Sequence, residues 1–247
     1  MRLKDKVAII TGGSRGIGYA AADKFLKEGA AVIVTASTQG SADRAVTKLK
    51  EKYPDAIVDG ISPDLASLES VRKAFKEVTG KYGCVDILVN NAGISESTPF
   101  MEYTEETYDK VMDLNVKGVF TATRAAAECM VARGEGVILS TSSMVSISGQ
   151  PSGFAYPASK FAVNGLSRRM SRTASVRART PLVRLLSPPG RPAARLSLRS
   201  GMTARASTMR PYCARPSKTG LPPPMWSTAT VKSSTFSCLP ASPPIPR

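Results

Sequence analysis

Histidine is absent from all 247 residues of this chain. Its absence excludes Ser-His-Asp and Cys-His catalytic arrangements and any metal site with histidine ligands. Cysteine is scarce, because only Cys84, Cys129, Cys213 and Cys238 occur, far apart and without a Cys-x-x-Cys pair. We therefore expect isolated thiols rather than disulfides, and no metal site.

Long apolar runs are also missing. No hydrophobic run approaches the ~20 residues of a membrane span. The N-terminus begins with charged residues and leads directly into a short apolar segment, which is not the pattern of a secretory signal. The sequence therefore predicts a soluble, cytoplasmic protein without a membrane partner.

Acidic residues are missing from one part of the chain. Residues 1–166 carry 19 Lys plus Arg and 19 Asp plus Glu, whereas residues 167–247 carry 13 Arg, 2 Lys and no acid. The same tail holds 13 of the 18 prolines, which interrupt helices and strands. Its charge is compatible with nucleic-acid binding, but the tail lacks interleaved aromatic residues that stack on bases. Nucleic-acid binding is therefore the weaker hypothesis.

Residues 1–166 alternate short apolar runs with amphipathic stretches. The apolar runs predict strands at Lys6–Ile10, Ala31–Thr35, Ala56–Ile61, Val85–Asn90 and Gly136–Ser140. The amphipathic stretches predict helices over Gly16–Lys27, Ser41–Lys52, Ser67–Tyr82 and Thr104–Arg133. This alternation predicts an α/β fold with a Rossmann-type, doubly wound parallel sheet, and the length suits a single domain.

Candidate binding residues follow the predicted strands. The loop from Thr11 to Gly18 after the first strand places Gly12, Gly16 and Gly18 where a bare backbone can approach a pyrophosphate at a helix N-terminus. Later strands are followed by Asp64-Leu65, by Asn90-Asn91-Ala92-Gly93 and by Ser143. A glycine cluster alone is equally typical of a tight turn. Ligands of open α/β sheets bind at these carboxyl ends, so together the residues predict a dinucleotide site.

Tyr156 and Lys160, in Tyr-Pro-Ala-Ser-Lys, follow Ser143 by 13 and 17 residues. A phenol has a pKa of ~10 and exchanges a proton poorly at neutral pH unless a fixed cation favours its anion. In a helix, positions i and i+4 share a face, so Lys160 can be that cation. The pattern predicts hydride transfer.

The motifs at Thr11–Gly18, Asn90–Gly93, Asn115, Ser143 and Tyr156-x-x-x-Lys160 together resemble the short-chain dehydrogenases/reductases, over about two thirds of the chain. This resemblance implies that Tyr156 is the general acid in carbonyl reduction and the base in alcohol oxidation. Lys160 would lower the pKa of Tyr156 and hold the nicotinamide ribose, and Ser143 would hydrogen-bond the substrate oxygen. Asn115 would hold a water that links Lys160 to solvent.

The resemblance also implies a set of cofactor-binding residues. They are Gly12, Ser14, Arg15, Gly16, Ile17, Gly18, Ser37, Thr38, Asp64, Leu65, Asn91, Ala92, Gly93, Tyr156 and Lys160. Asp64 would contact the adenine. The alternatives are that Asp64 is a turn residue, Ser143 a polar loop residue and Asn115 part of a solvated helix face.

The end of the second predicted strand bears on the choice of cofactor. It reads Thr35-Ala-Ser-Thr38 and lacks the acid that usually holds the ribose hydroxyls of NAD. Arg15 can face a 2′-phosphate, so NADP(H) is favoured. The alternative is that Arg15 is an exposed loop charge and that NAD(H) is accepted too.

The substrate class stays open at this point. The segments Glu51–Pro54, Pro63–Leu65 and Gly149–Tyr156 resemble bacterial bile-acid hydroxysteroid dehydrogenases, while the general pattern is equally that of 3-oxoacyl-carrier-protein reductases. We rank a generic carbonyl reductase first. Phe100 and Phe154 can line an apolar substrate pocket or pack in the core, and we favour core packing for both. The resemblance further implies a homodimer or homotetramer that assembles through Thr104–Arg133 and the helix that begins at Ala155.

The tail departs from the family. After Leu166 the family continues its helix into another strand, a Pro-Gly turn and a substrate lid, but residues 167–247 show no such pattern. Their Arg, Pro and Ser content is typical of a GC-rich gene translated out of frame, so we expect a reading-frame change near residue 167. If the tail is real, the alternative is a nucleotide-binding protein without catalysis.

Overall fold

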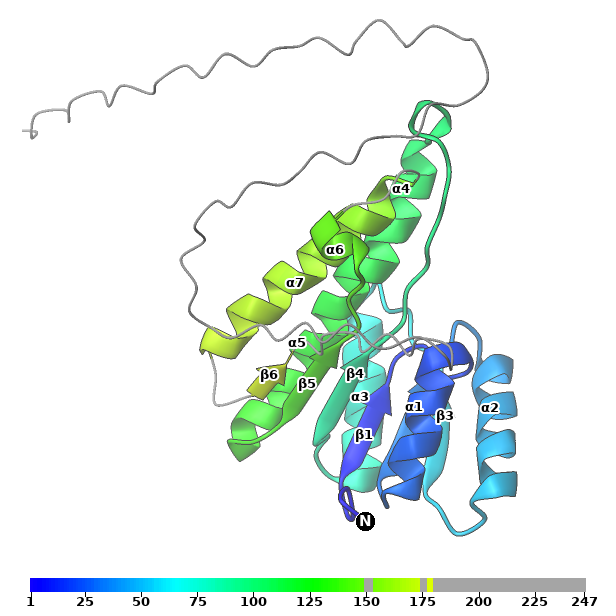
Figure 1. The fold of residues 1–247 in the computed structure, drawn as a ribbon. Helices are drawn as coiled ribbons and strands as arrows, with labels where there is room; N and C mark the ends of the chain where they lie inside the picture. The colour runs from blue at the N-terminus through cyan, green and yellow to red at the C-terminus, as the bar shows by residue number, and fades with distance from the viewer. Residues whose placement is uncertain (149–152, 174–176, 180–247) are drawn as a thin grey trace, which may run out of the picture. The chain divides into compact units, whose positions relative to one another are not determined.

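A single parallel sheet organises the described residues, 1–148, 153–173 and 177–179, in a computed structural model. Its strands are β1 (Val7–Ile10), β2 (Ala31–Thr35), β3 (Val58–Ile61), β4 (Ile87–Asn90), β5 (Val137–Ser140) and β6 (Arg177–Arg179). Their order is β3-β2-β1-β4-β5-β6, and all neighbouring pairs are parallel. The predicted α/β doubly wound sheet in one domain is confirmed (Figure 1).

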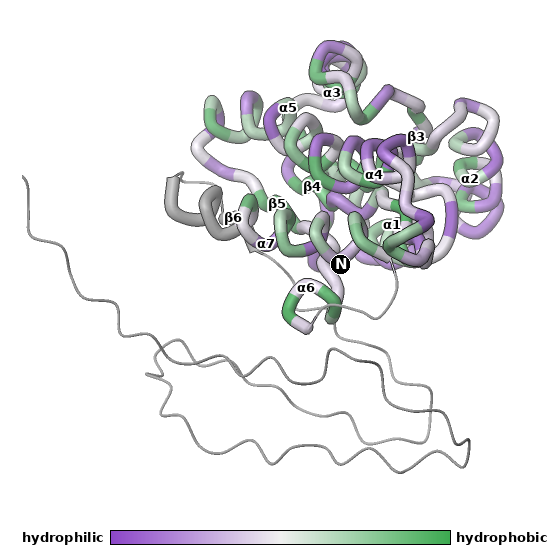
Figure 2. The backbone as a smooth tube through the Cα atoms, turned by 90° about the horizontal axis from the view of Figure 1, so that it is seen from above, coloured by the Kyte–Doolittle hydropathy of each residue, from purple (hydrophilic) through white to green (hydrophobic). Residues whose placement is uncertain are grey.

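Helices connect the strands. They are α1 (Gly16–Lys27), α2 (Gln39–Lys52), α3 (Leu68–Tyr82), α4 (Glu105–Met112), α5 (Gly118–Arg133), α6 (Val145–Ser148) and α7 (Ala155–Thr173), with a 3₁₀ turn η1 (Phe100–Glu102) and a π-helical segment η2 (Asp113–Lys117). The predicted helix over Thr104–Arg133 therefore consists of α4, η2 and α5. The helix α6, much of it hydrophobic, lies beside α7 (Figure 2).

Helices cover both faces of the sheet. Successive side chains of a strand point to opposite faces, so each strand contributes to two apolar clusters. Ile9 and Leu88 belong to one apolar cluster, which also contains Phe75 of α3 and Met130 of α5. Ile10 and its strand neighbours belong to a second cluster, which is closed by residues of α1 and α2. Two covered faces explain why the strands read as continuous apolar runs rather than as alternating ones.

Hydroxyl side chains set the start of three helices. Thr38 Oγ1 accepts from Ser41 N (3.3 Å), Ser67 Oγ from Ser70 N (3.3 Å) and Thr104 Oγ1 from Thr107 N (3.2 Å). Each bond satisfies a backbone donor that a helix cannot satisfy internally.

Regular structure continues past Leu166. The helix α7 runs on to Thr173, and the strand β6 pairs with β5, although the sequence pattern predicts neither helix nor strand there. The expectation of no further regular structure was wrong for these residues. The segments 149–152, 174–176 and 180–247, with Cys213 and Cys238, lie outside the described residues.

A disulfide joins Cys84, which precedes β4, to Cys129 on α5. The prediction of isolated thiols is therefore wrong for this pair. The two Cα atoms are 5.9 Å apart, within the ordinary range for a disulfide. Their sequence separation of 45 hides this proximity, since it arises only when α5 packs against α3.

A buried carboxylate fixes the edge of the sheet where the strands begin. Asp86, only 8% exposed, accepts from Val7 N (2.8 Å), Arg133 Nη2 (2.7 Å) and Lys6 Nζ (3.2 Å). Burial raises the pKa of Asp86, but the Val7 N–H and the two cations outweigh burial and hold the pKa below its ordinary value. Asp86 thus ties β1, β4 and α5 together.

No helix in the described part of the chain is long and apolar enough to cross a membrane. Within the same residues, no cluster of three or more Cys, Asp or Glu side chains could hold a metal ion.

Candidate active site

The loop between β1 and α1 requires glycine at several positions. Gly12 and Gly16 have positive φ angles of 63° and 56°, which favour glycine. A Cβ on Gly18 would overlap the Gly12 carbonyl oxygen and lie 2.6 Å from Asn91 Nδ2. Backbone angles at Gly12 and Gly16 and close packing at Gly18 therefore favour glycine, and a loop of bare backbone is the kind of cradle that a pyrophosphate needs.

The N-terminus of α1 is open. Arg15 stands at its N-cap position, and within the described residues no side chain caps it and no acid lies in its first turn. Arg15 and Ile17 are exposed, and Ser14 is half-buried. An uncapped N-terminus with a nearby guanidinium can bind an anion.

Thr11 joins this loop to the one after β4. Its buried Oγ1 accepts from Asn91 N and Ala92 N, both at 3.0 Å. In return, Asn91 Nδ2 donates to Thr11 O (3.1 Å) and Gly12 O (3.2 Å). The two predicted cofactor segments are therefore a single hydrogen-bonded unit.

The end of β2 also meets the glycine loop. Thr35 Oγ1 accepts from Gly12 N (3.3 Å), and the exposed residues Ser37 and Thr38 follow. Arg44 Nη2 donates to Ser41 Oγ (2.9 Å) at the start of α2, beside the Thr38 cap. Sequence reasoning missed Arg44, although a basic residue one turn into the helix after an acid-free β2 is a usable signal.

Asp64 and Leu65 follow β3. One Asp64 oxygen accepts from Ala66 N (2.9 Å), so this carboxylate forms a local turn, as the alternative interpretation holds, while the residue stays exposed. Leu65 is buried, and its carbonyl accepts a hydrogen bond from Thr121 Oγ1 (2.6 Å) on α5.

Asn115 lies in η2 and is 1% exposed, so a solvated helix face is excluded. Its Nδ2 donates to Ile94 O (2.9 Å) and Ser159 Oγ (3.0 Å), and its Oδ1 accepts from Ile94 N (2.9 Å). A Cβ on Gly93 would come within 3.0 Å of this Oδ1 and 3.7 Å of Lys160 Nζ. Asn115 therefore holds the loop after β4 against α7.

Lys160 is 6% exposed, and its Nζ donates to Thr141 O (2.9 Å) and lies 5.6 Å from the centre of the Tyr156 ring. Burial lowers the pKa of Lys160. The predicted pairing of these two side chains on one face of α7 is present. The arrangement can supply a proton-transfer group beside a fixed amine.

Ser143 lies on the loop after β5. Its Oγ accepts from Val145 N (3.4 Å), and its carbonyl accepts from Ser146 Oγ (2.6 Å). Asn164 Nδ2 of α7 donates to the same Ser146 Oγ (2.8 Å). These bonds fasten the Ser143 loop to the helix that carries Tyr156.

Glu96, on the chain between β4 and α4, is a site neighbour that sequence reasoning missed. Its Oε1 accepts from Phe154 N (3.0 Å) and Tyr156 N (3.3 Å), so it reaches the first turn of α7. The sequence gives no signal for this contact, because 58 to 60 residues separate the partners.

Phe100 and Phe154 do not pack in the core, so that prediction was wrong. They are 67% and 49% exposed, and their ring centres lie 5.3 Å apart. Tyr103 and Tyr108 also contact Phe154, with ring centres 6.1 and 6.2 Å away. Apolar rings are therefore presented next to the start of α7.

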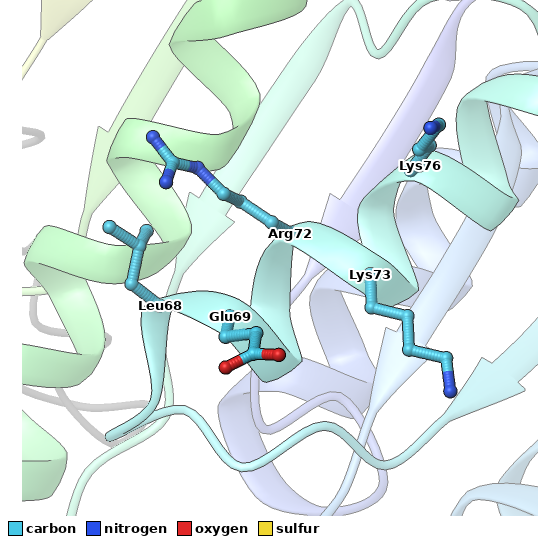
Figure 3. Close-up of a pocket in the computed structure, with 5 residues that line it drawn as sticks. All are labelled: Leu68, Glu69, Arg72, Lys73 and Lys76. Carbon is cyan, nitrogen blue, oxygen red and sulfur yellow. The ribbon is translucent and has the colours of Figure 1, made fainter.

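A shallow surface hollow elsewhere is lined by Leu68, Glu69, Arg72, Lys73 and Lys76, all on α3 (Figure 3). Arg72 points toward α5, where its Nε donates to Glu128 (3.0 Å). None of the predicted site residues lines this hollow, which is therefore not the candidate site.

The structure thus brings the predicted residues to the carboxyl ends of β1, β2, β4 and β5, where the glycine cradle fits a dinucleotide. Asp64 and Leu65 follow β3 at the same edge.

Comparisons with known proteins agree with this geometry. A family model for short chain dehydrogenase matches residues 6–179. A 3alpha-hydroxysteroid dehydrogenase of Mediterraneibacter gnavus is 55% identical over 172 residues, which cover 70% of this chain and 69% of that protein. The 3-oxoacyl-[acyl-carrier-protein] reductase FabG of Thermotoga maritima is 36% identical over 172 residues, with the same coverage of 70% and 69%.

Two solved structures are similar as well. The crystal structure of gox2181 matches with a TM-score of 0.66 and 34% identity, over 69% of this chain and 66% of that one. A structure from Sinorhizobium meliloti 1021, described as a short-chain alcohol dehydrogenase, matches with a TM-score of 0.65 and 30% identity, over 68% and 66%. The chain therefore spans just under two thirds of each solved chain.

Proposed function

The chain belongs to the short-chain dehydrogenase/reductase family, and from this premise we propose that it interconverts a secondary alcohol and a ketone, with Tyr156 as the general acid or base. The observation that carries the proposal is the buried Lys160 ammonium, fixed by Thr141 O beside the Tyr156 ring. A nicotinamide cofactor, NAD or NADP, is what the family implies, and when bound it accepts or donates the hydride.

The residues divide the remaining work. In ketone reduction the Tyr156 hydroxyl donates its proton to the carbonyl oxygen, and in alcohol oxidation the phenolate takes a proton back. The Lys160 cation favours the phenolate and contacts the ribose, while Ser143 Oγ orients the substrate oxygen. The Asn115 side chain is already hydrogen-bonded to Ile94 and Ser159. Its main chain therefore holds the water that links Lys160 to solvent.

Replacing Tyr156 by Phe tests this assignment. The change removes only the hydroxyl, so kcat should fall by roughly 10²–10⁴-fold while the cofactor Kd stays within about twofold. Tyr53→Phe, on the loop after α2, is the matched control and should keep the wild-type rate. A Tyr156→Phe enzyme with a near-normal rate would refute the role of Tyr156.

We further propose a preference for NADP(H). Support comes from the acid-free end of β2 and from two cations, Arg15 at the start of α1 and Arg44 at the start of α2. Arg15→Ala and Arg44→Ala should each lower kcat/KM for NADPH by about tenfold and leave that for NADH nearly unchanged. Lys73→Ala on α3 is the control, and equal losses with both cofactors would contradict the preference.

For the substrate we propose the hydroxysteroid class. The 55% identity to a 3alpha-hydroxysteroid dehydrogenase supports it. Exposed apolar side chains support it as well: Phe154 precedes α7 and contacts Phe100, Met144 precedes α6, and Ile147 lies on α6. A fused-ring substrate would bury such surface favourably. The second candidate, a 3-oxoacyl thioester, rests on the 36% identity to FabG. Comparing kcat/KM for a 3-oxosteroid and a 3-oxoacyl thioester decides between them.

Association into a homodimer or homotetramer is also proposed. Phe120 and Val131 of α5 and Phe161 of α7 are 50%, 59% and 51% exposed. Large apolar side chains on neighbouring helices are typical of surfaces that become buried between subunits. Light scattering of the purified protein tests this, and a monomer at micromolar concentration would contradict it.

The origin of residues 167–247 is a separate proposal. We propose that the reading frame changes near residue 167, although the match to the family model extends to residue 179. Because the tail has no acid and many prolines, and because unpaired charges are costly to bury, we do not expect it to supply the family's remaining strand and substrate lid. We expect a chain with this literal tail to aggregate and to lack hydride transfer. A soluble, active enzyme whose intact mass matches 26.2 kDa and this sequence would refute the frame change.

A further inference from the structure

We propose that Glu96 and Tyr103 are positioning residues that cap the first turn of α7 and thereby set the place of Tyr156. The inference rests on the proposed function of Tyr156. It concerns a contact between the chain that follows β4 and α7, the helix that carries the acid-base group. In Figure 1 the start of α7 lies beside α4.

Three successive backbone N–H groups at the start of α7 donate hydrogen bonds to these two side chains. Glu96 Oε1 accepts from Phe154 N (3.0 Å) and Tyr156 N (3.3 Å), and Tyr103 Oη accepts from the intervening Ala155 N (3.3 Å). The first N–H groups of a helix have no partner inside the helix. Gly153-Phe154 precedes α7 and offers no Ser, Thr, Asp or Asn side chain as a local cap, so the distant pair takes that role.

The carboxylate of the cap is itself held in place, because Glu96 Oε2 accepts from Thr98 N (3.2 Å). Burial, with a further contribution from Glu96, raises the pKa of Tyr103, so its hydroxyl stays protonated. A carboxylate at a helix N-terminus is also favoured by the helix dipole.

The cap links Tyr156 to the cofactor side of the site. Glu96 stands three residues after Gly93, on the loop that Thr11 and Asn115 hold in place. Tyr156 is the last of the three capped residues, so the position of its main chain depends directly on Glu96. Misplacing a reacting group by about 1 Å can cost on the order of 10²-fold in rate.

Four variants of the full chain test the inference. Glu96→Ala removes the acceptor, Glu96→Gln keeps an acceptor oxygen, Tyr103→Phe removes the second acceptor, and Glu102→Ala removes an exposed carboxylate of η1 that has no hydrogen bond to α7 within the described residues. The measurements are kcat and KM per cofactor-binding site, the Kd of NADPH, and amide exchange of the peptide that spans residues 153–156, with and without NADPH.

We expect Glu96→Ala to lower kcat by about 10–100-fold with KM and the NADPH Kd within about threefold. Glu96→Gln should restore most of kcat, Tyr103→Phe should lose about three- to tenfold, and Glu102→Ala should match the wild type. Exchange at the start of α7 should be about tenfold faster in Glu96→Ala, and NADPH should no longer slow it. A merely structural role would instead lower the folded fraction and leave kcat per site unchanged.

The outcomes separate the two proposals. Wild-type kcat in Glu96→Ala, alongside a dead Tyr156→Phe, overturns the positioning role alone, whereas an active Tyr156→Phe overturns the proposed function. If Glu96→Ala fails to fold, an unaltered kcat in Tyr103→Phe overturns the positioning role. If the wild type shows no turnover, exchange decides: faster exchange at residues 153–156 in Glu96→Ala than in Glu102→Ala supports the cap, and equal exchange in these two variants overturns it.

Discussion

Replacing Thr11 by Val tests whether one hydroxyl holds the two cofactor loops together. Valine keeps the shape of threonine but removes Oγ1, which accepts from Asn91 N and Ala92 N at 3.0 Å and donates to Val89 O at 3.4 Å. Both amides lose their acceptor, while the methyl packing of the 2%-exposed side chain is retained.

The expected loss follows from these contacts. An amide left without a partner costs about 1–3 kcal/mol, and because Asn91 and Ala92 are only half-buried we take about 1 kcal/mol for each, or about 2 kcal/mol in total. For a domain of this size that corresponds to a fall in Tm of about 4–8 °C. NADPH should also bind more weakly, by about tenfold, because the loop from Asn91 to Gly93 is no longer fixed.

Urea unfolding with a shared m-value measures the stability, and fluorescence titration measures the affinity. Thr11→Ser is the matched control, since it keeps the hydroxyl and loses one methyl group, at a cost of about 0.8 kcal/mol. The reasoning fails if the Val variant is as stable as the Ser variant, or if the Val variant binds NADPH as tightly as the wild type.

Two further predictions concern other parts of the fold. The pKa of Asp86 is lower in the folded protein than in the unfolded chain, where it is about 4. The stabilisation that Asp86 gives the fold is therefore fully present above pH 4 and is lost as pH falls through the folded-state pKa. Asp86→Asn should therefore be about 1–3 kcal/mol less stable at pH 7, with the difference shrinking below pH 4 in urea titrations; a difference independent of pH would contradict this. Gly18→Ala should weaken NADPH binding by at least about tenfold, because the new Cβ overlaps the Gly12 carbonyl. Gly80→Ala on α3 is the control, since a Cβ there meets nothing within 4 Å; it should leave NADPH binding unchanged and protein stability equal or slightly higher. Equal losses of NADPH affinity in Gly18→Ala and Gly80→Ala would refute the steric argument.

Local patterns were sufficient to predict β1 to β5 and most helices, but not β6. The apolar run of β2 was predicted with its observed bounds, Ala31–Thr35, because a strand covered on both faces must be apolar throughout. The predicted helix over Ser67–Tyr82 matches α3 to within one residue, and in the structure the Ser67 hydroxyl caps its start. The pairing of Lys160 with Tyr156 was equally predictable, since helical spacing alone puts them on one face.

Features that depend on distant packing were not predictable. The Cys84–Cys129 disulfide and the Glu96 contact with α7 join residues far apart in the chain, and neither partner carries a local signal. The exposure of Phe100 was missed because hydrophobicity does not tell a core residue from one that faces a substrate or another subunit. The continuation of α7 to Thr173 ran against a composition that otherwise argues for no regular structure.

The π-helical segment η2 makes the number of residues between α4 and α5 matter as much as their identity. A π turn contains one residue more than an α turn needs, and each residue of an α-helix turns the following side chains by about 100°. Deleting one residue near Asp113 would let an ordinary helix form with good backbone geometry, yet it would swing Asn115 away from Ile94. A single-codon deletion here should therefore be more harmful than most substitutions, and a family alignment should show this stretch free of gaps.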